Sequence, residues 1–223
     1  MGLMGHRSYP HEAQKNAQNG IKITQEAERP VVAFDFDGTL TCTDSLNALL
    51  KWQAGHVGFA FAGIRLIPAL LAYAVRPDRG ALKAALLRDL WRGRPLDQIE
   101  AEAEAFADVA FDRLIRLDAL AAWQRWQQEP VTLGIVTASP ALTVAPFARR
   151  LGADFLIGSE LAQNADGAVT GLDGPNCRGE EKVRRLEALF GPDFTLLAAY
   201  GDTGGDREML ARAREGHYRL FRG

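Results

Sequence analysis

The sequence predicts an α/β fold, a doubly wound parallel sheet with a Rossmann-like core and an inserted all-helical cap. Short apolar segments alternate with helical patterns along most of the chain, which is typical of doubly wound sheets. A nearly continuous helical block at 45–128 interrupts this alternation after the first strand. Polar side chains directly follow the expected strands, at the end where such sheets bind ligands. Together these observations favour a sheet whose functional edge lies under a helical insertion.

The expected elements follow one another in a regular order. Four short apolar runs predict buried strands, at Val31–Phe34, Val131–Val136, Phe155–Ile157 and Thr195–Tyr200. Helices are expected from Ser139-Pro140 to about Leu151, over 180–190 and over 206–214, with Ser139 as a plain N-cap. Asp166-Gly167 predicts a hairpin within 160–172, and turn signals at 76–80 and 93–95 divide the helical block.

These elements divide the chain into three parts. Residues 1–29 are polar and contain no apolar segment of the kind found in signal peptides, so we expect a flexible tail there. Residues 30–44 and 129–223 are expected to form the catalytic α/β core. Residues 45–128 are expected to form the helical cap.

Composition and charge exclude several classes of protein. Of the 223 residues 47% are apolar and 24% are charged, which is ordinary for a globular chain and excludes collagen-like, coiled-coil and wholly disordered structures. The net charge of −2 gives no overall attraction to nucleic acid. The two cysteines, Cys42 and Cys177, make neither a disulfide framework nor a zinc cluster, and they fit a reducing cytoplasm.

One apolar segment, Val57–Val75, raises the question of a membrane. It has 19 residues with one charge, Arg65, and one proline, Pro68, and is long enough to span a bilayer. A single span would separate the chemical residues that lie on either side of it in sequence. We therefore expect either buried helices broken near Pro68 or a segment that touches a membrane surface. Residues 51–95 carry eight basic and two acidic side chains, a local charge of +6.

The strongest chemical pattern follows the first strand. Asp35, Asp37, Gly38 and Thr39 lie in the run Asp-Phe-Asp-Gly-Thr. Since alternate residues of a strand face one side, the two carboxylates can face one site. Such a pair suits a divalent cation, and a carboxylate can attack phosphorus. The alternative is an acidic loop that caps a helix.

Three further sites follow the later strands. Thr137 ends the second strand, where a hydroxyl and free N–H groups at a helix start can bind an anion. Lys182 lies in a first helical turn, where a cation opposes the helix dipole unless an anion is nearby; the alternative is a solvated lysine. Asp202 follows the fourth strand in a glycine-rich turn and is placed to bind a metal, and Asp206 can cap the next helix.

Together these motifs resemble the haloacid dehalogenase superfamily, in its phosphatase branch, over about residues 31–220. The insertion after the first motif resembles the helical cap of the phosphoserine phosphatase-like subgroup. The run Asn176–Lys182 and the tail His217-Tyr218-Arg219 are most similar to bacterial members of that subgroup, including the type C phosphatidylglycerophosphatases.

The resemblance implies a catalytic cycle with a covalent intermediate. Asp35 would attack the phosphoryl group, and Asp37, with a raised pKa, would protonate the leaving oxygen and later activate water. Mg²⁺ would be held by the carboxylates of Asp35 and Asp202 and the backbone carbonyl of Asp37. The resemblance also implies a set of groups around the phosphate: Gly38, Thr39, Thr137, Ala138 and Lys182 as phosphate-binding residues, with Asp206 ordering Lys182 or a metal-bound water.

The substrate is less well specified than the reaction. Phosphoserine phosphatases carry Glu where this chain has Asp44, and Asn176 and Arg178 are further candidates for substrate contact. The apolar, basic cap favours a lipid phosphate such as phosphatidylglycerophosphate, with the protein in peripheral contact with the cytoplasmic membrane face through its cap. The alternatives are a small soluble phosphate such as phosphoserine, or a binding domain that has lost turnover. No nucleic-acid partner is expected.

Overall fold

The computed structural model describes Ile21 and residues 29–65 and 91–222. Most of the expected tail and residues 66–90 of the expected cap therefore lie outside the described residues. The strands are β1 (Val31–Phe34), β2 (Thr132–Pro140), β3 (Phe155–Gln163), β4 (Val169–Asp173), β5 (Leu196–Gly201) and β6 (Glu215–Tyr218). The helices are the short turn η1 (Phe36–Leu40), α2 (Ser45–Arg65), α5 (Leu96–Leu114), α6 (Leu117–Trp126), α7 (Ala141–Leu151), α8 (Glu180–Phe190) and α9 (Arg207–Arg212).

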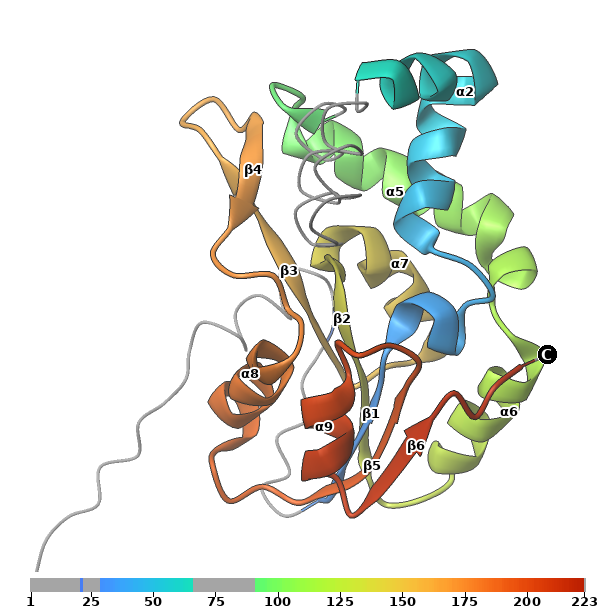
Figure 1. Ribbon diagram of the computed structural model, residues 1–223, viewed down its shortest axis with the longest axis vertical. Coiled ribbons are helices and arrows are strands. Elements are labelled where there is room, and N and C mark those ends of the chain that lie inside the picture. The colour runs from blue at the N-terminus through green and yellow to red at the C-terminus, as the bar shows by residue number, and fades with distance from the viewer. Residues whose placement is uncertain (1–20, 22–28, 66–90, 223) are drawn as a thin grey trace, which may run out of the picture.

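The six strands form one sheet in the order β4-β3-β2-β1-β5-β6 (Figure 1). β1 lies centrally and pairs in parallel with β2 and β5, β2 pairs in parallel with β3, and β5 with β6. Only β4 runs against its neighbour, because it returns from β3 as a hairpin. The predicted α/β fold with a mostly parallel sheet and a helical insertion is confirmed.

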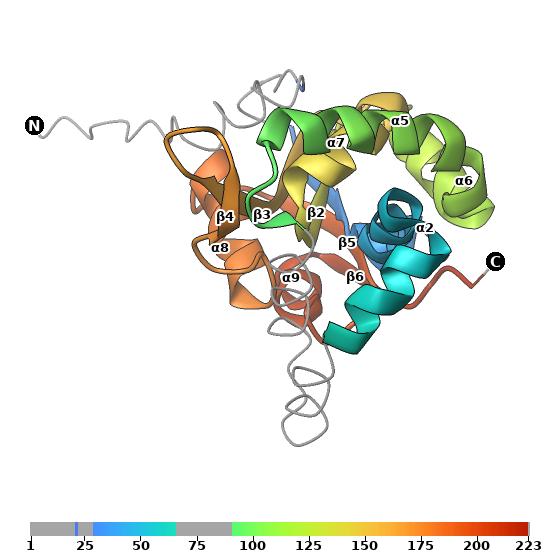
Figure 2. The ribbon, with the colours of Figure 1, turned by 90° about the horizontal axis from the view of Figure 1, so that it is seen from above.

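The sheet is covered on both faces, which explains why its central strand is wholly apolar. Val32 and Phe34 of β1 pack into a large core with residues of α5, α6 and α7. Val31 and Ala33 face the other way, into a second core with residues of α8 and α9. Figure 2 shows α7 on one side of the sheet and α8 and α9 on the other.

The inserted helices α2 and α5 lie beyond the carboxyl ends of the parallel strands (Figure 1). α5 is fastened to α7, because Arg149 pairs with Glu104 and Arg150 with Asp108. The segment before α5 is also fixed by backbone hydrogen bonds to the β3–β4 hairpin. The amide of Gly93 donates to the carbonyl of Val169 at 2.8 Å, and the Val169 amide donates to the carbonyl of Arg94 at 2.9 Å.

α6 falls within the expected cap range and packs against the sheet. The ring of Trp123 meets Phe34 of β1 edge-on at 5.2 Å between centroids, and Trp126 Nε1 donates to the Tyr200 hydroxyl of β5 at 2.9 Å. The division into a tail at 1–29, a core at 30–44 and 129–223, and a cap at 45–128 stays a prediction.

Three details differ from the elements expected. β2 runs on to Pro140, and α7 begins at Ala141 with no side-chain cap, so the N-cap role expected of Ser139 is wrong. α9 ends at Arg212, earlier than expected. β6 was not expected, because its residues are mostly exposed and form no apolar run. Within the described residues, no helix has the length and apolar character needed to cross a membrane.

Candidate active site

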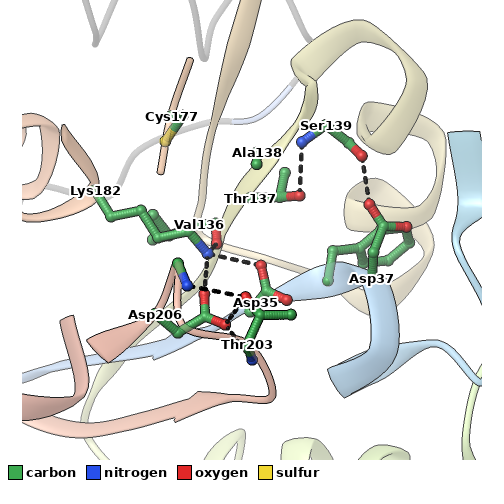
Figure 3. A network of polar contacts seen from close by, with 12 residues as sticks. Asp35, Asp37, Val136, Thr137, Ala138, Ser139, Cys177, Lys182, Thr203 and Asp206 are labelled. Atoms are coloured by element: carbon green, nitrogen blue, oxygen red, sulfur yellow. Dashed lines mark hydrogen bonds and ion pairs between the residues drawn. The ribbon is translucent and has the colours of Figure 1, made fainter. Parts of the chain in front are cut away.

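Three parallel strands deliver polar residues to one edge of the sheet. Asp35 directly follows β1, Thr137 lies in the last part of β2, and Asp202 directly follows β5. Because these strands are neighbours and parallel, their carboxyl ends meet. Figure 3 shows Asp35, Thr137, Lys182 and Asp206 converging at this edge.

Lys182 of α8 lies at the centre of the site and is 1% exposed. Its Nζ donates to Asp35 Oδ1 at 2.7 Å, to Asp206 Oδ1 at 2.6 Å and to the backbone carbonyl of Val136 at 2.6 Å (Figure 3). All three hydrogens of an ammonium group are therefore used. The alternative of a solvated surface lysine is wrong.

Burial and charge compete within this cluster. Burial raises the pKa of Asp35 to about 7, against the lowering effect of Lys182. Burial disfavours the charge of Lys182, but the two carboxylates outweigh it and raise the pKa of Lys182 above its ordinary value. Burial also acts to raise the pKa of Asp206, yet Lys182 and the hydrogen bonds from Thr203 lower it overall. The lysine thus stays charged between two carboxylates.

Asp202 completes a set of carboxylates that could hold a metal ion. One oxygen from each of Asp35, Asp202 and Asp206 lies within 4.8 Å of the others. Both oxygens of Asp206 already accept hydrogen bonds, from Lys182 and Thr203. By contrast, Asp202 Oδ1 is buried and has no hydrogen-bond partner among the described residues. A buried, unsatisfied carboxylate oxygen fits a hard cation such as Mg²⁺, so Asp35 and Asp202 are the better candidates for ligands.

The approach of Asp202 to the first motif depends on a glycine. Gly38 has a φ of 85°, and a Cβ atom there would lie 2.4 Å from Asp202 Oδ2. Any other residue would be strained and would push the carboxylate away. Burial, followed by the charge of Asp206, raises the pKa of Asp202. A bound cation would favour the ionised form of this group.

Asp37 lies in a different setting from Asp35. Its Oδ1 accepts hydrogen bonds from the Ser45 amide at 2.7 Å and the Ser45 hydroxyl at 2.6 Å. Its Oδ2 accepts a hydrogen bond from the Ser139 hydroxyl (Figure 3). Ser45 is the first residue of the inserted helix α2, and Ser139 belongs to β2. The second carboxylate of the motif is therefore tied to both the insertion and the core.

The other expected phosphate-binding residues have different hydrogen-bond partners. Thr137 is buried, and its hydroxyl accepts a hydrogen bond from the Ser139 amide at 3.0 Å. The Ala138 carbonyl accepts a hydrogen bond from Ser159 at 2.9 Å. Thr39 is buried, and its hydroxyl has no partner among the described residues. Their roles toward phosphate stay predictions.

The three candidate substrate residues have different surroundings. Asp44 Oδ1 accepts a hydrogen bond from the Asn47 amide at 2.8 Å, as an N-cap of α2 does. Asn176 Oδ1 accepts a hydrogen bond from Ser159 at 2.8 Å. Arg178 is exposed and lies over Gly205, where an added Cβ would meet its Cγ at 2.7 Å. The structure thus leaves Arg178 the most accessible of the three.

Two residues of the site were missed by sequence reasoning, Ser45 and Ser139. Ser45 stands eight positions after Asp37, just where the helical pattern begins, which is a faint signal. Ser139 stands before a proline, which favours the N-cap interpretation. Neither pattern contains a signal for a bond to Asp37, because that contact depends on how β2 and α2 are placed.

Comparison with known sequences identifies relatives over most of the chain. The sequence matches the haloacid dehalogenase-like hydrolases over residues 32–211. It is 56% identical over 194 residues to the protein CicA of Caulobacter vibrioides, covering 86% of this chain and 87% of the relative. The superfamily resemblance is confirmed, and the finer resemblance to type C phosphatidylglycerophosphatases stays a prediction.

Solved structures share the fold at low sequence identity. A protein of unknown function from Bordetella pertussis is 24% identical, with a TM-score of 0.68 over 82% of this chain and 86% of its own. A substrate-bound phosphoserine phosphatase is 14% identical, with a TM-score of 0.57 over 83% of each chain. A phosphoserine phosphohydrolase-like protein from Francisella tularensis is 18% identical, with a TM-score of 0.59 over 85% of each chain.

Proposed function

The chain belongs to the haloacid dehalogenase-like hydrolases, and from that premise we propose that it is a Mg²⁺-dependent phosphatase of phosphomonoesters. One observation carries the proposal. Asp35 follows the central strand, is bonded to the buried Lys182, and lies within 4.8 Å of a carboxylate oxygen of Asp202. A nucleophile, a fixed cation and a metal-binding carboxylate are the groups that phosphoryl transfer needs.

Asp35 and Asp202, with the backbone carbonyl of Asp37, would hold the Mg²⁺. When bound, the ion neutralises negative charge on the phosphoryl oxygens. In the first step, an oxygen of Asp35 forms a bond to phosphorus while the bond from phosphorus to the leaving oxygen breaks. Asp37 gives its proton to that oxygen, so the product leaves as an alcohol. Lys182 orients Asp35 through the bond to Oδ1.

In the second step, water hydrolyses the aspartyl-phosphate. Asp37 takes a proton from the attacking water, the bond between Asp35 and phosphorus breaks, and inorganic phosphate leaves. We infer that the hydroxyl of Thr137 holds a phosphoryl oxygen in both steps. Lys182 would do the same only by exchanging one of its three present hydrogen bonds for a bond to the phosphoryl group. Asp206 keeps Lys182 in place and charged.

The substrate we propose is a small phosphorylated metabolite. Phosphoserine phosphatases are among the structural relatives, and this supports a small phosphomonoester over the lipid phosphate first expected. The apolar, basic block behind the lipid expectation extends through residues 66–90, which lie outside the described residues. The presence of Asp35, Asp37, Lys182 and Asp202 argues against a binding domain that has lost turnover.

The test is release of inorganic phosphate from a panel of phosphomonoesters that includes phosphoserine and phosphatidylglycerophosphate. We expect activity that needs Mg²⁺, disappears with EDTA and returns when Mg²⁺ is restored. A rate that EDTA leaves unchanged would contradict the metal assignment. No release from any member of the panel, with the Asp35→Asn variant equally inactive, would contradict the phosphatase function.

A further inference from the structure

The strand β6 brings one more residue to the functional edge of the sheet. β6 pairs in parallel with β5, and Gly201 lies opposite Tyr218. Arg219, the next residue, therefore lies beside Asp202, at the same edge of the sheet as Asp35 and Thr137. Each of these positions follows or ends a parallel strand, which is where such sheets place groups that bind ligands.

Arg219 is held in an unusual conformation at this position. Its φ of 53° makes it the one non-glycine residue of the described chain with a positive φ, and such backbone strain is concentrated at functional sites. Its amide donates to the Gly201 carbonyl and its Nε to the Asp202 carbonyl, both at 2.8 Å. The backbone and the root of the guanidinium are thus fixed against the loop that carries Asp202.

The outer part of the guanidinium remains available. The side chain is exposed, and its Cζ lies over the ring of Tyr218, 5.1 Å from the centroid. Within residues 29–65 and 91–222, no carboxylate forms an ion pair with it. An arginine that is anchored through Nε keeps its two terminal amino groups to donate to an anion, and a planar pair of donors fits a carboxylate or a phosphate.

The spacing of the strands indicates how far from the phosphoryl group such an anion would lie. β6 stands two strands from β1, and neighbouring strands are about 4.8 Å apart, so Arg219 follows a strand roughly 10 Å from that of the nucleophile. The proposed phosphoryl site, at Asp35 and Lys182, lies nearer to β1. The available donors of Arg219 are placed for a group that is several bonds away from the phosphorus atom.

We propose that Arg219 binds a second anionic group of the substrate, a carboxylate or a phosphodiester, and so selects phosphomonoesters that carry a further negative charge. This inference rests on the proposed phosphatase function and adds the chemical class of its substrate. A carboxylate belongs to small acidic metabolites, and a phosphodiester belongs to a phospholipid headgroup. The alternative is that Arg219 only holds the loop of Asp202 in place.

The test measures by calorimetry how tightly the protein binds a set of phosphomonoesters in the presence of Mg²⁺. The protein carries the substitution Asp35→Asn, which prevents turnover. O-phosphoserine is compared with O-phosphoethanolamine, which lacks the carboxylate. Glycerophosphoglycerol phosphate is compared with glycerol 3-phosphate, which lacks the phosphodiester. The binding of inorganic phosphate, which is also measured with the wild-type protein, reports on the phosphoryl site alone. The second anion of at least one pair is expected to tighten binding about tenfold, and Arg219→Gln is expected to remove that gain.

Arg214→Gln is the matched control, because Arg214 is exposed and precedes the same strand at the opposite edge of the sheet. It is expected to keep the gain. If Arg219→Gln fails to fold, Arg219→Lys tests the same point, since it keeps the charge and loses the planar pair of donors. The pair that responds identifies the source of the anion.

Three results would overturn the inference. The first is that neither second anion tightens binding. The second is that Arg214→Gln removes the gain in affinity as fully as Arg219→Gln does. The third is that Arg219→Gln weakens the binding of inorganic phosphate by the same factor as the binding of the larger probes. The last result would make Arg219 a positioning residue for Asp202. Failure of the wild-type protein to bind inorganic phosphate is a different result, because it overturns the proposed function and this inference with it.

Discussion

The two carboxylates of the first motif, two residues apart, are held by different parts of the molecule. Asp35 is 6% exposed and is bonded to Lys182 of α8, so its surroundings belong to the core. Asp37 is bonded by Ser45, the first residue of the inserted helix α2, as well as by Ser139 of the core. The proposed nucleophile is thus held without a bond to the inserted helix α2, and the proposed acid is held with one.

This difference indicates how one fold can serve several substrates. The proposed nucleophile, Asp35, needs the same geometry for every phosphomonoester, and its buried bond to Lys182 supplies that geometry. The proposed proton donor, Asp37, must meet leaving groups of different shape, and its bonds to Ser45 connect it to the helix that lies over the strand ends. Changes on the Asp35 side should therefore abolish the chemistry, whereas changes on the Asp37 side should modulate it.

The largest effect is expected from Asp35→Asn. An amide is a poor nucleophile, so kcat should fall by about 10³-fold or more in the phosphate-release assay. Asp173→Asn is a matched control, because Asp173 is an exposed residue of β4. It should keep wild-type activity. Substantial turnover by Asp35→Asn would contradict the covalent mechanism.

Lys182→Met tests the ion pair on the same side. Without the ammonium, the buried carboxylates of Asp35 and Asp206 have no opposite charge bonded to them, and breaking such a buried ion pair costs about 3 kcal/mol or more. Urea denaturation at pH 8 with EDTA should show a loss of that size in the free energy of unfolding. Lys51→Met, at an exposed residue of α2, should change it by less than about 0.5 kcal/mol. Equal effects of the two substitutions would mean that the buried pair contributes little.

Ser45→Ala and Ser139→Ala test the Asp37 side. Each removes one hydroxyl that orients the carboxylate, so kcat should fall by about tenfold, with a smaller change in KM. Thr170→Ala, at an exposed position of β4, should have no effect. If Ser139→Ala lowers kcat and Ser45→Ala does not, the core alone positions Asp37. Asp35 and Asp37 would then no longer differ in their dependence on the inserted helix α2.

Much of this fold could be predicted because apolar runs report burial directly. The strands at Val31–Phe34 and Phe155–Ile157 are buried, and their patterns locate them within the observed strands. β6 could not be predicted, because an edge strand with exposed side chains needs no apolar residues. The end of β2 was misplaced because Ser139-Pro140 is also a common start of a helix.

The site was predictable to a similar degree, for a related reason. Asp35, Thr137 and Asp202 come at the ends of strands, and the parallel topology alone requires those ends to meet. The full burial of Lys182 was not predictable, because a lysine in a first helical turn is usually solvated. Its depth follows from the way α8 packs on the sheet. Likewise, the bonds from Ser45 and Ser139 to Asp37 depend on tertiary placement rather than on spacing in sequence.

The smallest effect concerns the pH dependence of stability. Burial raises the pKa of Asp35 to about 7 in the folded, metal-free protein, from 3.8. The folded state therefore binds this proton more tightly than the unfolded state does. The resulting stability is fully present below about pH 4, and it is lost as the pH rises through about 7. Asp35→Asn removes that loss, because an amide does not titrate.

Melting temperatures of the two proteins in EDTA should therefore diverge with pH. Between pH 5 and pH 8 the melting temperature of the wild-type protein should fall by roughly 5 °C relative to that of Asp35→Asn. Asp206 works in the opposite direction, since its pKa is lowered, but it is present in both proteins. Adding Mg²⁺ should narrow the difference, because a cation that binds ionised Asp35 stabilises the folded state at high pH. If the two melting temperatures change in parallel with pH in EDTA, burial does not raise the pKa of Asp35. Asp35 and Asp37 would then differ only in the residues to which they are hydrogen-bonded.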